Sequence, residues 1–456
     1  MNNSIQGICI NFIEKVLEVV GRDEVWQLSE LETGLGKLSD EFLKDTIATY
    51  LKEIDRGILE DKAARKKAGL VVERRDEERT IITRFGALTY PRAYYLNKQD
   101  QRYEHPVDQA VGIEAYERVS VNLAASLVNY ATDVSYAKSS VYGSNGEISR
   151  QSVMNMVRKL NSVEHRPSCL TKKILPELHI TADEDHVALQ DGRNVQVPLI
   201  VVYEGLKRES KGRYRCIGAR YFSDYGKTTR QLWEAVDDYI EEHYDSTALK
   251  KIYLHGDGAA WIKAGCELLP RCVFVLDDFH QNKALMRATG AQPEKREALR
   301  NAVYRSDYDE FLELCEKLYK GAKSTAEKKR ITEFQGYLCN NWESIEIKRK
   351  ENCGGCCAEG QVSHVLSARL SSRPMGWSEE SLIPMTILLS RKANRIQVNA
   401  EDFKRKAAIL EECVVKAVSR AKKTLGDVDP DRLWKNYSLS TGKVTPLFRV
   451  LRGASM

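Results

Sequence analysis

Residues 178–189, LHITADEDHVAL, decide the fold, because their alternation of apolar and polar side chains is typical of a β-strand. The same alternation places Asp183 and Asp185 on one face of that strand and Glu184 on the other. The segments that follow have the character of strands at 195–206 and 213–223, a helix at 228–244, a strand at 250–258, a helix at 259–269 and a strand at 271–279. We therefore expect a mixed α/β core.

A second acidic residue closes the strand expected at 250–258. Asp257 directly precedes Gly258, and a glycine allows the backbone to approach a ligand closely. His255 lies on the same face of the strand by alternation. Asp277 and Asp278 follow the next expected strand, so they form an alternative acidic pair.

A third acidic residue, Glu359, lies in CAEGQVSHVLSARLSSRP, residues 357–374. Glycines precede this segment and Pro374 closes it, which predicts one helix with Glu359 in its first turn. Two strand carboxylates and one helix carboxylate suit a phosphoryl-transfer site, where two metal ions activate the attacking oxygen and neutralise the leaving oxygen. Mg²⁺ prefers carboxylate oxygens as ligands.

The motif VSHVLSARLSSRPMGW, residues 362–377, together with the acids at 183 and 257, resembles the DDE transposases of bacterial insertion sequences. Within them the chain looks like the Mutator-like branch. The element order of residues 178–279 also resembles the ribonuclease H-like fold. This resemblance implies a transposase that binds the ends of its insertion sequence, cuts there, and transfers the strands to target DNA.

The resemblance also implies how the chemistry is distributed along the chain. Asp183, Asp257 and Glu359 would be catalytic and would hold two Mg²⁺ ions, for which Mn²⁺ can substitute, and Asp185 is the reserve metal ligand. A ribonuclease H-like catalytic core would occupy 170–281 and 351–390, separated by a helical insertion at 282–350. Partners would be terminal inverted repeats, target DNA and further copies of the chain in a homodimer or larger multimer.

Residues 135–160, SYAKSSVYGSNGEISRQSVMNMVRKL, have the form of a helix, a glycine-containing turn and a second helix that begins near Ser149. A helix-turn-helix unit places its second helix in the major groove of DNA, although a plain helical hairpin gives the same pattern. Candidate DNA contacts on this helix and near the acidic motifs are Arg150, Gln151, Asn155, Arg158, His255, His280, His364, Arg369 and Arg373.

The flanking regions differ from the core in pattern and charge. Residues 1–75 have helical periodicity, and 76–165 combine a β-hairpin, expected at 80–97, with the helix-turn-helix. The helical C-terminal region, 391–456, carries fifteen basic and seven acidic residues in a chain of net charge +5. A basic segment on a nearly neutral body suits contact with a polyanion, and a solvated helical face is the alternative.

Composition places the protein in a broad class. With 456 residues we expect two to four domains, and 42% hydrophobic with 30% charged residues is typical of a soluble globular protein. We expect neither a membrane span nor a signal peptide. The eleven cysteines are then expected to stay reduced in the cytoplasm, with the protein associated with the nucleoid.

Other chemistries fit the sequence less well. Cys353, Cys356, Cys357 and His364 offer one half of a zinc site, but a second half is missing nearby. A serine-hydrolase elbow and a phosphate-binding P-loop are both absent from the sequence. The remaining alternatives are a structure-specific nuclease and a catalytically inactive DNA-binding regulator with the same core.

Overall fold

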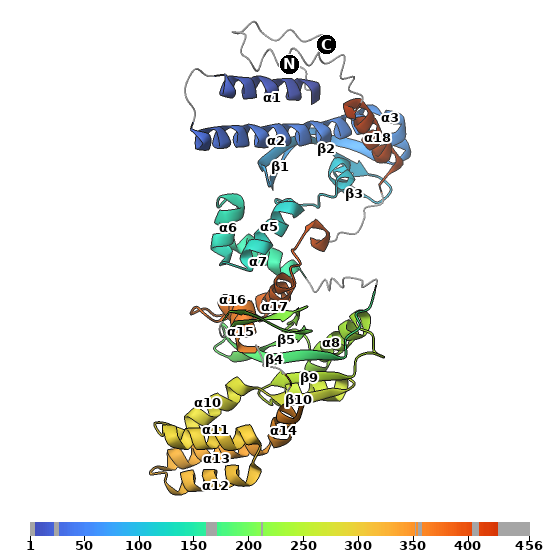
Figure 1. Ribbon diagram of the computed structural model, residues 1–456. Coiled ribbons are helices and arrows are strands. Elements are labelled where there is room, and N and C mark those ends of the chain that lie inside the picture. The colour runs from blue at the N-terminus through green and yellow to red at the C-terminus, as the bar shows by residue number, and fades with distance from the viewer. Residues whose placement is uncertain are drawn as a thin grey trace. The chain divides into compact units, whose positions relative to one another are not determined.

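The computed structural model describes residues 5–21, 27–160, 171–210, 213–351, 353, 358–403 and 410–426. Clustering of the backbone divides the chain into two compact units. Unit 1 comprises Met1–Leu127, Ser140–Ile148 and Asn399–Met456, and unit 2 comprises Val128–Ser139 and Ser149–Val398. Figure 1 shows the elements, most of them with their labels.

Unit 1 joins long helices to a small antiparallel sheet of strand order β1-β2-β3. Its elements are α1 (Ile5–Val20), α2 (Leu28–Glu60), α3 (Lys62–Lys67), β1 (Leu70–Thr83), β2 (Gly86–Asn97), β3 (Arg102–Glu104), α4 (Pro106–Ala110), η2 (Ala400–Phe403) and α18 (Glu412–Gly426). Two helices, α5 (Val121–Ala131) and α6 (Tyr136–Ser144), cross the boundary between the units. The helical region expected to reach residue 75 thus ends at Lys67, because β1 carries many charged residues that conceal its strand character.

The core of unit 1 forms where α2 meets β2 and α18. Ile54 and Ile58 of α2 are fully buried beside Tyr95 of β2. At Gly57 an added Cβ would lie 3.1 Å from the side chain of Ala417, so glycine permits the close approach of α2 and α18. The described part of the basic C-terminal region therefore includes a packed helix; residues 404–409 and 427–456 lie outside the described residues.

Unit 2 is built on a five-stranded mixed sheet of order β10-β9-β4-β5-β8. Its strands are β4 (Glu177–Ala188), β5 (Asn194–Tyr203), β8 (Arg220–Phe222), β9 (Lys251–Gly256) and β10 (Cys272–Leu276). Strand β4 pairs in parallel with β9 and antiparallel with β5. Two helices, α8 (Thr229–His243) and α9 (Ala260–Leu268), cover the face of β4 that carries Leu178, Ile180 and Ala182.

Two of the expected strands are each divided in the structure. The strand expected at 195–206 contains the end of β5, at Tyr203, and the beginning of β6 (Gly205–Ser210). The strand expected at 213–223 is divided into β7 (Arg213–Ile217) and β8. Strands β6 and β7 form a separate two-stranded sheet. Gly205 and Gly218 have positive φ at the two breaks, and this backbone redirects the chain out of the main sheet.

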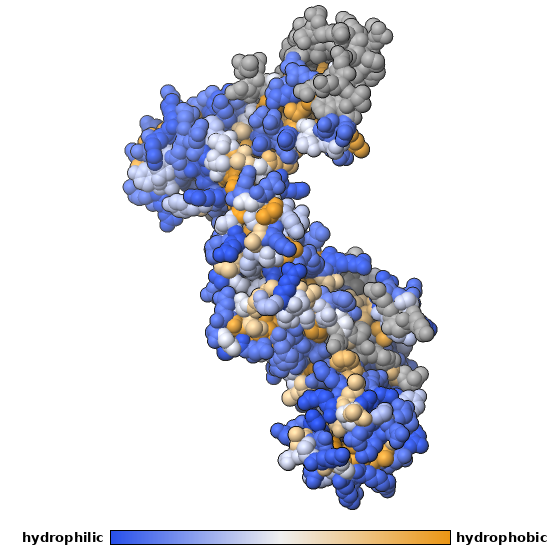
Figure 2. All heavy atoms as spheres, turned by 90° about the vertical axis from the view of Figure 1, so that its left-hand side faces the viewer, coloured by the Kyte–Doolittle hydropathy of each residue, from blue (hydrophilic) through white to orange (hydrophobic). Residues whose placement is uncertain are grey.

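After β10, the chain forms a run of helices before it returns to the sheet. These are α10 (Asp278–Thr289), α11 (Pro293–Arg305), α12 (Tyr308–Lys320), α13 (Thr325–Cys339) and α14 (Trp342–Glu351). They enclose a core of their own around Phe311, Phe334 and Trp342. On the side shown in Figure 2 their surface is mostly hydrophilic, with a few apolar patches. We refer to α10–α14 below as the insertion.

Short helices complete unit 2. They are α7 (Arg150–Lys159), α15 (Ala358–Val362), a π-helical turn η1 (Ser363–Ser367), α16 (Ala368–Leu370) and α17 (Glu379–Ala393). Helix α7 begins after Ser149, whose side chain accepts a hydrogen bond from the backbone N–H of Ser152 and so caps the helix. Among the described residues, no helix is both long enough and apolar enough to cross a membrane.

Candidate active site

Asp183 and Asp257 lie at matching positions on two neighbouring parallel strands. Thr181 of β4 pairs with His255 of β9, and each aspartate follows two residues later on its own strand or just past its end. Neighbouring strands are about 4.8 Å apart. The register therefore brings together two carboxylates that are far apart in the sequence, on the face of β4 opposite Ile180 and Ala182.

Each of these carboxylates is fixed through one oxygen. The Oδ1 of Asp183 accepts from the backbone N–H of Glu184 at 2.9 Å, and the Oδ1 of Asp257 accepts from that of Ala259 at 2.8 Å. Both side chains are half-buried. The second oxygen of each makes no hydrogen bond within the part of the chain that the structure describes, so it is available to a ligand.

The electrostatics of Asp183 reflect its burial beside another acid. Burial raises the pKa of Asp183 to about 6, and the charges of Glu184 and Asp257 act in the same direction. The hydrogen bond from Glu184 and the nearby His280 oppose this shift. A cation bound beside the two carboxylates would stabilise their ionised forms and so oppose the effect of burial.

The alternative acidic pair is already engaged with other groups. Asp277 is buried and caps α10, accepting from the backbone N–H of Phe279 at 3.2 Å and pairing with Nδ1 of His280 at 3.1 Å. That hydrogen bond, helped by Asp183 and Asp257, raises the pKa of His280. Asp278 pairs with the buried Lys348 at 2.7 Å. Both acids thus have partners inside the protein.

Asp185 lies deeper than Asp183 on the same strand. It is buried, and its Oδ1 accepts from the hydroxyls of Ser367 at 2.9 Å and Ser371 at 2.8 Å. Its Oδ2 is buried without a hydrogen-bond partner among the described residues. Ser367 ends the π-helical turn η1, and such turns occur often at functional sites. Asp185 therefore fixes the segment after α15 against β4.

Glu359 lies in α15, and this helix packs against β4, the strand that carries Asp183. The side chain of Glu359 is outside the described part of the structure. Within the described residues, no group of three or more His, Cys, Asp and Glu side chains is placed to share a metal ion. Of the cysteines considered for zinc, Cys353 is buried, and Cys356 and Cys357 lie outside the described residues.

Three residues expected to contact DNA are engaged with other parts of the protein. His255 is fully buried, with its Nε2 3.4 Å from Nδ1 of His179, and burial lowers its pKa to about 3. Arg369 is buried, donates to the carbonyl of Ala131 at 2.8 Å and lies over the ring of Trp377. Arg158 donates to the hydroxyls of Ser378 and Ser381 and pairs with Glu380 at 3.0 Å, which ties α7 to α17.

The other expected DNA contacts have different surroundings. Arg150, Gln151 and Asn155 are exposed on α7, and the amide of Gln151 donates to Asn155 at 3.2 Å. His364 and Arg373 are also exposed. His280 is half-buried beside the acids. These six side chains remain accessible for contact with a ligand.

Several residues that support the acids have no recognisable pattern in the sequence. Tyr337 of α13 donates its hydroxyl to the backbone carbonyl of Asp257 at 2.8 Å. A Cβ on Gly258, where φ is +94°, would lie 2.9 Å from the side chain of Asn341. Tyr337, Asn341 and Lys348 all belong to the insertion or its connections, far from the acids in sequence, so no local motif could link them.

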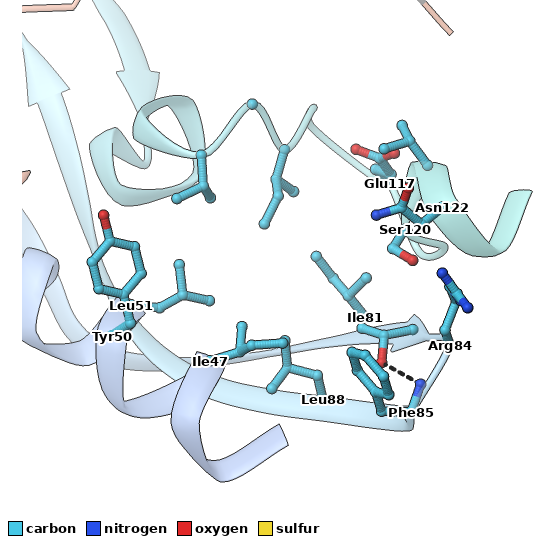
Figure 3. A pocket seen from close by; sticks show the side chains of 15 residues that line it. Ile47, Tyr50, Leu51, Ile81, Arg84, Phe85, Leu88, Glu117, Ser120 and Asn122 are labelled. Carbon is cyan, nitrogen blue, oxygen red and sulfur yellow. Dashed lines mark hydrogen bonds between the residues drawn. The ribbon is translucent and has the colours of Figure 1, made fainter. Parts of the chain in front are cut away.

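Unit 1 contains a separate pocket of about 300 Å³. Figure 3 shows the apolar side chains of Ile47, Leu51 and Leu88 along one side, with Arg84 and Asn122 at one end. Glu117 is the only carboxylate among its lining residues. Because a pair of carboxylates is missing there, the pocket does not suit the metal-dependent chemistry expected from the sequence.

The chain matches a family model described as "Uncharacterised protein family (UPF0236)" over residues 22–407. The chain belongs to this family. It is 36% identical over 457 residues to the UPF0236 protein TTE2489 of Caldanaerobacter subterraneus subsp. tengcongensis, covering 97% of this chain and 96% of the relative. It is 24% identical over 389 residues to the "UPF0236 protein in vanSb 3'region" of Streptococcus gallolyticus, covering 80% and 83%.

These relatives correct one expectation from the sequence. The assignment to the Mutator-like branch is wrong, because the family model and the relatives that cover almost the whole chain are UPF0236 proteins. The acidic residues and the motif at 362–377 are present in the chain, but they do not identify that branch.

Proposed function

We propose that this UPF0236 protein is a DNA transposase that binds the ends of its own mobile element and catalyses metal-dependent strand cleavage and strand transfer. The observation that carries the proposal is the placement of Asp183 and Asp257 side by side on β4 and β9, each with one oxygen free of hydrogen bonds to the described residues. Paired carboxylates on neighbouring strands are suited to hold divalent ions for phosphoryl transfer.

The element order of unit 2 supports a ribonuclease H-like catalytic core. Strands β4, β5 and β8 are followed by α8, β9, α9 and β10, with the hairpin β6–β7 as an addition. The insertion then separates this sheet from α15, the helix that contains Glu359 and packs on β4. In this proposal Glu359 completes the site with Asp183 and Asp257.

The donors present fit Mg²⁺, with Mn²⁺ as a substitute. Carboxylate oxygens are the ligands that Mg²⁺ prefers, and a bound cation would stabilise the ionised form of Asp183, whose pKa is raised mainly by burial. Asp183, Asp257 and Glu359 would hold two ions, with Asp185 as the reserve ligand. When bound, the ions supply activation of the attacking oxygen and neutralisation of the leaving oxygen.

Neighbouring side chains prepare these ligands. The hydroxyl of Tyr337 holds the backbone of Asp257, and Ser367 and Ser371 hold Asp185. His280, whose pKa is raised by Asp277, places a proton-bearing imidazole beside both carboxylates, where it can contact a phosphate oxygen. Rigid placement of ligands lowers the cost of assembling the reactive geometry.

The names of two relatives support a mobile element. One UPF0236 protein of Caldanaerobacter subterraneus, 37% identical to this chain, has a name that joins eleven locus designations, and another joins four. Several loci of one genome under one protein name are expected when a gene has been copied to many positions. A non-catalytic DNA-binding regulator has no need of such copies.

The remaining parts of the proposal concern partners and location. Exposed Arg150, Gln151 and Asn155 on α7 would contact the terminal repeats, as expected of the second helix of a helix-turn-helix. The protein would act as a homodimer or larger multimer on paired ends. It would work in the cytoplasm, on the nucleoid.

Incubation of the protein with the DNA that flanks its own gene, Mg²⁺ and a target plasmid tests the proposal. A transposase nicks at defined positions and joins the new 3′ ends to the target. Cleavage without joining would instead indicate a nuclease. Binding without any metal-dependent cleavage would indicate a regulator and would overturn the catalytic assignment.

A further inference from the structure

The insertion contains a small pocket of about 160 Å³ between α10 and α13. Its lining residues are Ala284, Arg287, Arg330, Glu333, Phe334 and Tyr337. The arginines are exposed, and Tyr337 is half-buried. The pocket therefore opens to solvent with two guanidinium groups at its edge.

One wall of the pocket begins at the acidic site. On α10, His280, Ala284 and Arg287 are spaced by four and three residues, so they lie on one face of the helix. His280 stands beside Asp183 and Asp257, whose charges contribute to its raised pKa. At 1.5 Å per residue, the seven residues from His280 to Arg287 span roughly 10 Å.

The other wall has the same spacing on α13. Arg330, Phe334 and Tyr337 share one face of that helix, and Tyr337 is the residue that bonds to the carbonyl of Asp257. Arg330 lies seven residues before Tyr337, again roughly 10 Å along the helix. Both walls thus lead from the carboxylates at one end to an arginine at the other.

The two arginines differ from other basic residues of the insertion. Neither Arg287 nor Arg330 makes an ion pair or a hydrogen bond to another residue in the described ranges. By contrast, Arg300 pairs with Glu297 at 2.9 Å. The pocket lining includes one carboxylate, Glu333, which lies 3.9 Å from the ammonium of Lys329, so the two arginines leave an excess of positive charge there.

The pocket and the facing sides of α10 and α13 that lead from it to the acidic site form what we call the trough. We infer that this trough binds the phosphodiester backbone of the DNA strand that leads away from the bond being cut, with Arg287 and Arg330 contacting one phosphate from its two sides. The inference rests on the proposed function and names further DNA-positioning residues for it. A guanidinium fork matches phosphate geometry. At about 3.4 Å of duplex axis per phosphate of one strand, a separation of roughly 10 Å places the contact within about three phosphates of the cleaved bond.

The experiment compares the wild-type protein with Arg287→Ala/Arg330→Ala and with the control Arg300→Ala, all checked for unchanged thermal unfolding. Cleavage of the flanking DNA by the wild-type protein is mapped first. Binding is then measured from 50 to 200 mM salt. We expect the slope of log K against log salt to fall by about one in the double variant, because one phosphate contact is lost, and to stay unchanged in the control.

A second measurement locates the contact. Methylphosphonates replace single phosphates, from the first to the sixth on either side of the mapped cleavage position. A neutral group at one position within about three phosphates of the cleavage should weaken binding by the wild-type protein and have no further effect on the double variant. If the wild-type protein cuts DNA but the double variant keeps the full salt slope and the same sensitivity to methylphosphonate substitution, the trough assignment is wrong and the proposed function stands. If the wild-type protein neither binds nor cuts, both fall.

Discussion

The hydroxyl of Tyr337 donates a 2.8 Å hydrogen bond to the backbone carbonyl of Asp257, across 80 residues of chain. This bond connects α13 of the insertion to the turn that carries one of the two adjacent carboxylates. The insertion is therefore part of the support for the acidic site. A change in α13 can alter the position of Asp257 without any contact to the reacting atoms.

Tyr337→Phe should lower the cleavage rate about tenfold or less, because one hydrogen bond contributes about 1 kcal/mol. The Mg²⁺ concentration needed for half-maximal cleavage should rise. Without this hydrogen bond the backbone at Asp257 is less restricted, so ion binding must also overcome the conformational entropy lost in fixing it. Tyr319→Phe, which removes a half-exposed hydroxyl on α12, is the matched control. An unchanged Mg²⁺ dependence in Tyr337→Phe would show that the bond has no role in positioning.

Asp257→Asn should abolish cleavage while DNA binding stays within about twofold. Asparagine keeps the shape and the oxygen that accepts from Ala259, but it removes the charge that holds a divalent ion. The expected loss is several kcal/mol of transition-state stabilisation, or on the order of 10³-fold in rate. Single-turnover nicking assays measure it, with the exposed Asp309→Asn as control. Persisting metal-dependent cleavage would remove Asp257 from the active site.

Asp183→Asn and Asp185→Asn separate the two candidates that strand alternation leaves open. Asp183 has an unengaged oxygen at a half-buried position, whereas Asp185 is buried and accepts from two serines. We expect Asp183→Asn to reduce cleavage on the order of 10³-fold and Asp185→Asn about tenfold or less. Equal losses in both variants would mean that Asp185 also holds a metal ion.

Local patterns predicted the elements that carry the acids. Alternation located β4, helical periodicity located α8, and the capping side chain of Ser149 marks the start of α7 near the expected residue. The division of the expected strands at Gly205 and Gly218 was missed, because a single glycine in an apolar run does not show where the chain leaves a sheet.

Local sequence patterns also predict the acidic site only in part, because it depends on contacts between distant segments. The motifs mark Asp183 within a strand and Asp257 at the end of another, and parallel pairing of β4 with β9 makes them neighbours. The burial of Arg369 and His255 depends on packing partners from distant segments, Ala131 and His179 among them. Sequence patterns encode the face of a strand or helix, but they do not encode what packs on that face.

A last prediction concerns unit 1, where Asp55 of α2 is buried and accepts from the backbone N–H of Ala93 at 3.0 Å. Burial raises the pKa of Asp55 from 3.8 to about 6, and the charges of Asp76 and Asp108 act in the same direction. The hydrogen bond from Ala93 and the charge of Arg92 act in the opposite direction and lower the pKa. Between pH 4 and 6 the folded state therefore holds more protons than the unfolded state.

Unit 1 should consequently lose stability as the pH rises from about 4 to about 6, by up to about 3 kcal/mol, because each unit of pKa difference corresponds to 1.36 kcal/mol. Asp55→Asn removes the titrating group while its Oδ1 can still accept from Ala93, so its stability should change much less over this range. Hydrogen exchange of β2 amides in urea, corrected for intrinsic rates at pH 4.5 and 7, measures the difference, with Asp40→Asn on the exposed side of α2 as control. Equal pH dependence in wild type and Asp55→Asn would mean that Asp55 titrates near its ordinary value and that other groups govern the acid response of this unit.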